Sequence, residues 1–352
     1  MKYRHLVLTL LITALGLPLY MPLSAYSAEE AKYHVIAAPS RKNSDLGYWA
    51  AVSQGYFKEA GVDVVSEDLE TRVLARDAVS SGSVNLSHVS INTALPSFEL
   101  GEPIKVVGSV FPRYPIVAIL NQDILKDNGL TADAFHKLDA KDRLLLLKDK
   151  NIGLAAAGGL EDQTLRAQLK AVGMSDPDSF AQIQYVQSFA ALEANFLQGR
   201  LDAIVSDAAN GVWYSERGQG VQLLTGDEQD RYLPETVIPA GTWIVNTDWL
   251  AKGDNREALR AFLSAWNKGT RWVASLPKDD LRQWVLDAFP EVTDPTAQDK
   301  LVLTAETNIH ETALDGKFKE ELLQRVVNFA LDQKTIKKHV DVNEIYTWEY
   351  LP

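Results

Sequence analysis

The sequence has no cysteine among its 352 residues. Without cysteine no disulfide can form, and an export signal cannot end in the cysteine that carries a lipid anchor. Beyond its first residues the chain also lacks an apolar run of roughly eighteen residues, the length that a membrane-spanning helix needs. These absences predict a protein with no lipid anchor and, beyond its first residues, no membrane span.

Sequence patterns for nucleotide and metal chemistry are missing as well. No GxxxxGK[ST] is present, which excludes an NTP-binding loop, and no GxGxxG follows an expected strand. The six histidines are scattered without a ligand spacing such as HExxH. Ser275–Lys278 fits SxxK but lacks the SDN and KTG companions, and no two carboxylates stand out as an acid/base couple. The sequence therefore predicts no catalytic residue, no metal and no cofactor.

The first 28 residues have the organisation of a secretory signal peptide. The basic start MKYRH precedes the apolar stretch LVLTLLITALGLPLY, and small residues follow in PLSAYSA. This pattern predicts export and cleavage near Ser27-Ala28.

Acidic residues outnumber basic ones in this chain. Asp and Glu number 47 against 35 Lys and Arg, a formal net charge of −12. The predicted signal peptide holds Lys2 and Arg4 but no acid, so the mature chain is more acidic still. An acidic protein is poorly suited to nucleic acid or anionic membrane surfaces. We therefore expect neither as a partner.

From Tyr33 onward, short apolar strands alternate with helical segments. The first set of strand patterns is YHVIAA, VDVV, VNLSHV, IKVVGSVF and YPIVAILN. A second set runs through NIGLAAAG, IQYVQ, LDAIVSD and VQLLTG to VIPAGTWIVNTDWL. From Asn255 the pattern is mostly helical. This order predicts an α/β fold with largely parallel sheets in two lobes, followed by a helical C-terminal region.

Several segments, in order, resemble the periplasmic substrate-binding proteins of ABC transporters in the nitrate, sulfonate, taurine and thiamine-precursor group. They are GYWAAVSQGYFKEAGVDVV, SGSVNLSHVSINTALPSFELGEPIKVVGSV and FLQGRLDAIVSD. The resemblance covers most of Ala31–Leu250 and is looser in the helical tail.

The resemblance implies a type II periplasmic-binding fold, in which two α/β lobes joined by two crossovers close on a ligand. It divides the chain into a signal peptide (1–28), lobe 1 (29–120), lobe 2 (121–240), and a return to lobe 1 with C-terminal helices (241–352). The crossovers are expected near Leu120–Asp123 and Pro239–Asn246. The implied function is that of a monomeric periplasmic protein, not an enzyme, that docks transiently on an inner-membrane permease and delivers a small molecule.

Polar and aromatic residues follow the expected strands of lobe 1, at the edge where open α/β sheets bind ligands. The candidate ligand-binding residues here are Asn43, Tyr48, Trp49, Ser90, Asn92, Phe111, Arg113 and Tyr114. The Arg113 guanidinium is suited to a sulfonate or carboxylate. Other roles stay open, because Ser90 can cap a helix and Arg113 can form an ordinary salt bridge.

Lobe 2 offers a strand, a Gly-Gly turn and a helix over Asn151–Met174. The free N–H groups at such a helix start can bind an anion, yet two acids stand in the first turn. The candidates in and after this turn are Gly158, Gly159, Leu160, Glu161, Asp162, Asp207, Asn210, Trp213, Thr242 and Trp243. Glu161 and Asp162 either match the helix dipole or point into the cleft.

These candidates leave the ligand open. The helix starts and Arg113 favour a sulfonate or similar organic anion. Aromatic walls with Glu161, Asp162 or Asp207 favour a thiamine-precursor pyrimidine or another amine-bearing nutrient. A pyrimidine-synthase-like enzyme on the same fold is a third reading, against which the missing cysteines and the export signal count. A receptor that presents its ligand to a membrane sensor rather than a permease also stays open.

Overall fold

The computed structural model describes residues 31–352 apart from 41, 70, 175, 187 and 238. The predicted signal peptide, residues 1–28, lies outside the described residues. No helix within the described residues is both long enough and apolar enough to span a bilayer.

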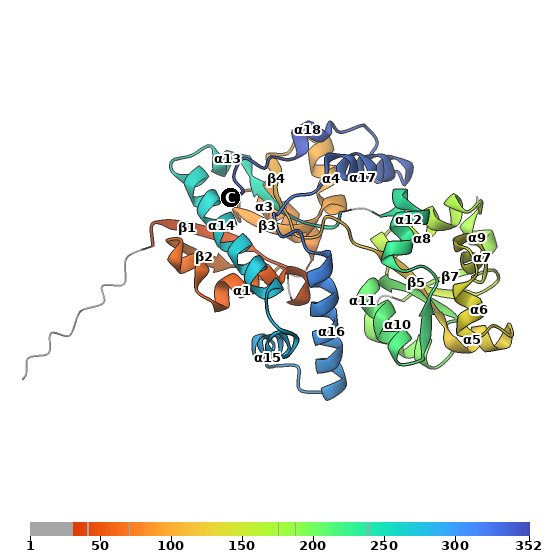
Figure 1. The fold of residues 1–352 in the computed structure, drawn as a ribbon. Helices are drawn as coiled ribbons and strands as arrows, with labels where there is room; N and C mark the ends of the chain where they lie inside the picture. The colour runs from red at the N-terminus through yellow and green to blue at the C-terminus, as the bar shows by residue number, and fades with distance from the viewer. Residues whose placement is uncertain (1–30, 41, 70, 175, 187, 238) are drawn as a thin grey trace, which may run out of the picture. The chain divides into compact units, whose positions relative to one another are not determined.

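The described chain builds two five-stranded sheets (Figure 1). Sheet A has the order β2-β1-β3-β10-β4, with strands β1 (Tyr33–Ala38), β2 (Val62–Ser66), β3 (Leu86–Ser90), β4 (Ile104–Ser109) and β10 (Gly241–Asn246). Sheet B has the order β7-β6-β8-β5-β9, with strands β5 (Ile116–Asn121), β6 (Asn151–Leu154), β7 (Gln182–Tyr185), β8 (Ala203–Asp207) and β9 (Gly220–Gln222). The two sheets confirm the predicted α/β class.

Each sheet is mixed rather than purely parallel. β10 runs antiparallel to β3 and β4, and β5 runs antiparallel to β8. These strands arrive from the other sheet, because the chain passes from sheet A to sheet B between Ser109 and Ile116 and returns between Gln222 and Gly241. Antiparallel pairing needs no helical crossover of its own. The residue boundaries of the two lobes remain a prediction.

Helices flank both sheets and dominate the C-terminal third (Figure 1). Between the strands of sheet A lie α1 (Leu46–Ser53), α2 (Tyr56–Glu59), α3 (Arg72–Ser80) and α4 (Ile91–Glu99). Those of the sheet B half are α5 (Gln122–Asp127), α6 (Ala132–His136), α7 (Ala140–Leu145), α8 (Leu160–Ala171), α9 (Pro177–Phe180), α10 (Phe189–Leu197), α11 (Ala208–Glu216) and α12 (Gly226–Tyr232). After β10 follow α13 (Thr247–Leu250), α14 (Asn255–Ala274), α15 (Lys278–Ala288), α16 (Pro295–Glu311), α17 (Glu320–Asp332) and α18 (Val342–Ile345). Two 3-10 helices, η1 (Lys42–Asp45) and η2 (Pro234–Thr236), complete the set.

The segment from Asp45 to Gly61, which the sequence predicts as one helix, forms two. Gly55 separates α1 from α2 with a φ of +71°, a left-handed conformation that suits glycine. The turn brings the Phe57 ring to 5.3 Å from Tyr48 and 5.0 Å from Phe262, so the break packs α2 onto α14.

The longest helix, α14, supplies much of the core beside sheet A. Leu259, Phe262, Leu263 and Trp266 are completely buried, as their helical spacing predicts. α14 meets α1 through Gly269, where an added Cβ would overlap the backbone oxygen of Gly47. This close approach fixes α1, and with it η1, the loop that follows β1.

Candidate functional site

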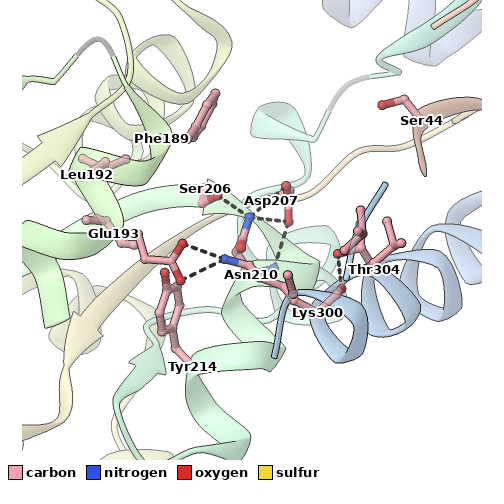
Figure 2. A pocket seen from close by; sticks show the side chains of 14 residues that line it. Ser44, Phe189, Leu192, Glu193, Ser206, Asp207, Asn210, Tyr214, Lys300 and Thr304 are labelled. Atoms are coloured by element: carbon pink, nitrogen blue, oxygen red, sulfur yellow. Dashed lines mark hydrogen bonds and ion pairs between the residues drawn. The ribbon is translucent and has the colours of Figure 1, made fainter. Parts of the chain in front are cut away.

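A cavity of about 590 Å³ opens beside the end of β8 (Figure 2). Its walls come from η1, α10, β8, α11, α16 and the segment before α16. They are lined by Ser44, Phe189, Leu192, Glu193, Ile204, Ser206, Asp207, Asn210, Tyr214, Val292, Ala297, Lys300, Leu301 and Thr304. The site thus joins η1, next to sheet A, with sheet B and a C-terminal helix.

Asp207 is the last residue of β8 and caps α11. Its carboxylate accepts a hydrogen bond of 2.9 Å from the backbone N of Asn210. The Asn210 side chain donates to the same carboxylate and, at 2.9 Å, to Ser206. Burial raises the pKa of Asp207, although these hydrogen bonds and the charge of Lys300 oppose the shift. Asp207 is therefore a fixed, partly desolvated acid in the cavity wall.

Glu161 adds a second carboxylate close to Asp207. Burial raises its pKa, and the charge of Asp207 raises it further. Both acids also raise the pKa of Tyr114, after the larger effect of burial. Among the described residues, no other side chain donates to Glu161. Two neighbouring acids without a cation of their own favour a ligand that brings N–H donors or a positive charge.

Asp162, the neighbour of Glu161, has a structural role. Its carboxylate accepts hydrogen bonds from the backbone N of Gly158 at 2.8 Å, from Arg166 at 2.7 Å and from Tyr185 at 3.1 Å. Gly158 has a φ of +68°, so the turn needs glycine there. Gly159 is the N-cap of α8, and Leu160 begins the helix. Asp162 fixes the Gly-Gly turn and is saturated by protein donors.

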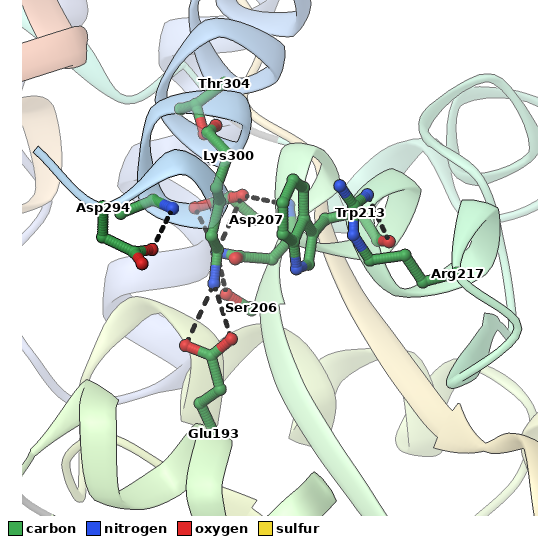
Figure 3. A network of polar contacts seen from close by, with 10 residues as sticks. Glu193, Ser206, Asp207, Trp213, Arg217, Asp294, Lys300 and Thr304 are labelled. Carbon is green, nitrogen blue, oxygen red and sulfur yellow. Dashed lines mark hydrogen bonds and ion pairs between the residues drawn. The ribbon is translucent and has the colours of Figure 1, made fainter.

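Lys300 of α16 reaches across the cavity to α10 (Figure 3). Its Nζ lies 3.1 Å from both carboxylate oxygens of Glu193. The aromatic rings of Tyr214 and Trp213 lie 5.4 and 5.9 Å from the same atom. Arg217 covers Trp213, which is itself buried in the sheet B core. The cavity thus contains one ammonium group that is already neutralised.

Arg113 lies on the passage from β4 to β5 and is surrounded by acids. It donates to Glu311 at 2.5 and 2.9 Å, to Asp227 at 3.1 Å and to Asp230. The hydrogen bond with Glu311, followed by the nearby acidic charges, raises the pKa of Arg113. The guanidinium joins α12 to α16, and its donors are occupied by protein carboxylates.

Four of the aromatic and polar candidates lie in the sheet A half, within the protein. Tyr48, Thr242 and Trp243 are fully buried, and Phe111 is nearly so. The Tyr48 hydroxyl bonds Ser66 at 2.5 Å, and the Thr242 hydroxyl donates to the backbone of Val89 at 3.1 Å. Phe111 contacts Tyr114 with ring centroids 5.4 Å apart. The structure places these side chains in the core rather than along the cavity.

The remaining candidates lie in η1, in α1 and at the start of α4, next to sheet A. Ser90 caps α4 by accepting from the backbone N of Thr93. The amide of Asn92 is shielded from solvent and has no hydrogen-bond partner among the described residues. Trp49 donates to the backbone of Ser40 at 3.1 Å and lines a second cavity. Asn43 belongs to η1, but its side chain lies outside the described part of the chain.

Of the predicted residues, the structure brings Asp207 and Asn210 into the cavity wall and places Glu161 and Tyr114 near them. Sequence reasoning missed Glu193, Lys300, Tyr214 and Thr304. Two signals were available: Glu193 is the one charge in the apolar helix FAALEANFL, and Lys300 and Thr304 share a helix face at i, i+4. Within the described residues, no group of three or more acids and histidines is arranged to hold a metal ion.

Comparison with known proteins defines the family. Residues 43–280 match the family described as NMT1/THI5 like. Since the match covers more than half of the chain, the protein belongs to this family. A relative from Saccharomyces cerevisiae, 4-amino-5-hydroxymethyl-2-methylpyrimidine phosphate synthase THI13, is 23% identical over 268 residues, which cover 69% of this chain and 67% of the relative.

Solved structures share the fold. The periplasmic aliphatic sulphonate binding protein SsuA from Escherichia coli superposes with a TM-score of 0.65 at 13% identity, covering 89% of this chain and 92% of that one. The periplasmic nitrate-binding protein NrtA from Synechocystis PCC 6803 gives a TM-score of 0.59 at 16% identity, with 90% and 86% covered. These likenesses confirm the predicted type II periplasmic-binding fold and the resemblance to this group of binding proteins.

Proposed function

We propose that this protein is the periplasmic solute receptor of an ABC importer. The observation that carries the proposal is the cavity, whose wall combines η1 beside sheet A with β8 and α11 of the sheet B half. A ligand that contacts both halves stabilises the closed arrangement, which is how a receptor of this fold retains a solute. The monomeric state and the export signal are part of the proposal.

The ligand that the geometry favours best carries ammonium or N–H groups. Asp207 and Glu161 are partly desolvated acids, whereas the cations Lys300 and Arg113 already have carboxylate partners. A cationic ligand group would relieve the repulsion between the two acids. Amine-bearing aromatic molecules, such as aminopyrimidines, combine this chemistry with rings that can pack on Phe189 or Tyr214.

A sulfonate or another small organic anion is the second candidate. The names of the structural neighbours favour it, because one binds aliphatic sulphonates and another nitrate. To bind such an anion, Arg113 would have to break a hydrogen bond to one of its protein carboxylates and form one to the solute. An enzymatic role of the kind named for the yeast synthase is not part of the proposal.

Thermal unfolding with two ligand panels tests the proposal. At a concentration of 100 times Kd a ligand adds about 2.7 kcal/mol to the free energy of unfolding, a readily measured rise in melting temperature. Amines and aminopyrimidines form one panel, and alkanesulfonates the other. If no member of either panel shifts the transition, the receptor proposal fails.

Two variants then separate the ligand classes. Glu161→Gln should weaken an amine roughly tenfold, about 1.4 kcal/mol, and leave sulfonates unaffected. Arg113→Ala should abolish sulfonate binding if the anion reading holds and leave amines unaffected if it does not. The exposed acid Glu216 on α11 supplies the control Glu216→Gln, which should bind as the wild type does.

A further inference from the structure

The surroundings of Lys300 have the composition of an ammonium-binding site. The Nζ atom sits 3.1 Å from both oxygens of Glu193, with the Tyr214 and Trp213 rings within 6 Å (Figure 3). A carboxylate and aromatic faces are the groups that recognise an ammonium ion in proteins. Glu193, Tyr214 and Trp213 are here called the ammonium box.

The box is built by rigid elements that do not depend on Lys300. Glu193 belongs to α10, and Tyr214 and Trp213 belong to α11, both of which pack on sheet B. Tyr214 and Trp213 are almost fully buried, at 1% and 4% exposure. Burial and then the charge of Glu193 raise the pKa of the Tyr214 hydroxyl, so it stays protonated beside the carboxylate. Lys300 comes from a different region, α16, and reaches the box on a flexible side chain.

We propose that the ammonium box is a ligand subsite that Lys300 occupies when no ligand is bound. An ammonium group of the solute would take the position of Nζ and displace Lys300. The inference rests on the proposed function, because it deepens the amine reading of the same cavity. Figure 2 shows the open side of the arrangement, where Ser206 and Asp207 stand beside the ion pair and could receive the rest of such a ligand.

Self-occupation has a measurable consequence for affinity. A ligand that binds only when Lys300 has left the box has an apparent affinity reduced by the fraction of time that the box is free. If the ion pair is formed about nine-tenths of the time, the reduction is roughly tenfold. Displacement also breaks the ion pair between Lys300 of α16 and Glu193 of α10, so ligand binding and the loss of this contact are linked.

The test compares Lys300→Met with the wild type. Methionine keeps the length of the side chain and removes its charge. The probe is benzylammonium, measured by calorimetry, with benzyl alcohol as the uncharged control. We expect Lys300→Met to bind benzylammonium roughly tenfold tighter than the wild type, and neither protein to bind benzyl alcohol comparably. Adding Glu193→Gln to Lys300→Met should remove the gain.

A matched control removes a second lysine of the same region. Lys278 pairs with Glu306 of α16 at 3.3 Å and is largely exposed. Lys278→Met should leave benzylammonium binding within twofold of the wild type. Lys300→Gln is the second variant, for the case that methionine disturbs the fold, which circular dichroism would report.

Two outcomes overturn the proposal. Equal or weaker binding of benzylammonium to both Lys300 variants would show that Lys300 does not compete for the box. Absence of binding to any of these proteins would show that the box accepts no free ammonium. In either case a solute from the thermal panels that still raises the melting temperature keeps the receptor function, so the two proposals can fail separately.

Discussion

Sheets A and B have one strand order and different chemistry at their edges. The third strand in each, β3 and β8, ends at the N-cap of a nine-residue helix. In sheet A this cap is Ser90, and in sheet B it is Asp207. The equivalent strands β1 and β6 are followed by different segments. η1 follows β1 in sheet A, and the Gly-Gly turn follows β6 in sheet B. The common topology dictates where caps are needed, and the residue chosen for each cap decides the charge.

The acids of the two halves differ in a further respect. In the sheet A half, Asp45 is completely buried and lies 3.5 Å from the equally hidden His88. In the sheet B half, Asp207 and Glu161 are partly buried, and neither forms an ion pair with another of the described residues. The buried acid of sheet A serves the fold, whereas Asp207 and Glu161 are the acids that we propose for ligand binding. Four predictions probe this contrast.

The largest effect is expected at two closely packed glycines, one in each half of the molecule. At Gly269 an added Cβ would overlap the backbone oxygen of Gly47 and lie 2.7 Å from the backbone N of Ala51. Backbone atoms of packed helices cannot yield, so Gly269→Ala should cost about 3 kcal/mol or more. At Gly153 in β6 the nearest atoms, at 2.5 and 2.6 Å, are the ends of the Leu201 and Leu192 side chains. These can rotate, so Gly153→Ala should cost about 1 kcal/mol.

Urea unfolding of both variants measures the difference. The contrast between backbone and side-chain contacts would be refuted if Gly153→Ala were as destabilising as Gly269→Ala.

The second prediction concerns the pH dependence of the Asp45–His88 pair. Burial raises the pKa of Asp45 to about 7, and burial together with the charge of Arg72 lowers the pKa of His88 to about 3. Between about pH 4 and 6.5, the unfolded chain holds one proton on His88 and the folded chain holds one on Asp45. The numbers of bound protons match, so the intact pair should leave the stability nearly independent of pH in this range.

If one residue of the Asp45–His88 pair is replaced, the free energy of unfolding should depend on pH through the residue that is left. In Asp45→Asn only the lowered pKa of His88 remains, and the free energy of unfolding should fall by roughly 2 kcal/mol from pH 7 to pH 5. In His88→Gln only the raised pKa of Asp45 remains, and the free energy of unfolding should rise by roughly 2 kcal/mol over the same range. Urea unfolding of both variants at pH 7 and pH 5 measures these changes. If the free energy of unfolding changed with pH in the same direction in both variants, the proposed compensation between Asp45 and His88 would be wrong.

The fold class could be predicted from the sequence because the patterns that indicate strands and helices are local and recur along the chain. Apolar strand patterns, glycines after helices and the apolar face of 255–274 each report short-range geometry. The antiparallel placing of β5 and β10 was not readable, because it depends on which sheet the strand joins. The break at Gly55 was likewise hidden, since a glycine inside a helical pattern leaves both outcomes open.

The candidate site was only partly readable for a physical reason. Asp207 and Asn210 follow a strand directly, so the topology places them at the cavity. Lys300 reaches the same cavity from α16, a helix that follows β8 only after many intervening elements, and no local pattern encodes that contact. The residue type of Arg113 suggests an anion site, while its partners Glu311 and Asp230 come from distant segments that no local pattern reveals.

The third prediction separates two neighbouring acids of the Gly-Gly turn. Asp162 is buried and accepts hydrogen bonds from Gly158, Arg166 and Tyr185, so Asp162→Asn should lower the free energy of unfolding by about 2 kcal/mol. Glu161 has a raised pKa and no side-chain donor, so Glu161→Gln should leave stability unchanged within about 0.5 kcal/mol. Thermal unfolding without ligand measures both. A large loss in Glu161→Gln would mean that this acid serves the fold, which would remove it from the proposed site.

The smallest effect is expected at the two equivalent caps. Ser90→Ala removes the acceptor for the backbone N of Thr93 and should cost about 1 kcal/mol. Asp207→Asn keeps an oxygen for the backbone N of Asn210, because asparagine caps helices as well as aspartate does. Its free energy of unfolding should therefore change by less than about 0.5 kcal/mol, while its affinity for an amine falls. If Asp207→Asn were instead as destabilising as Ser90→Ala, the charge at the end of β8 would be a structural requirement. In that case the difference between Ser90 and Asp207 would reflect the stability of α11 rather than recognition of a ligand.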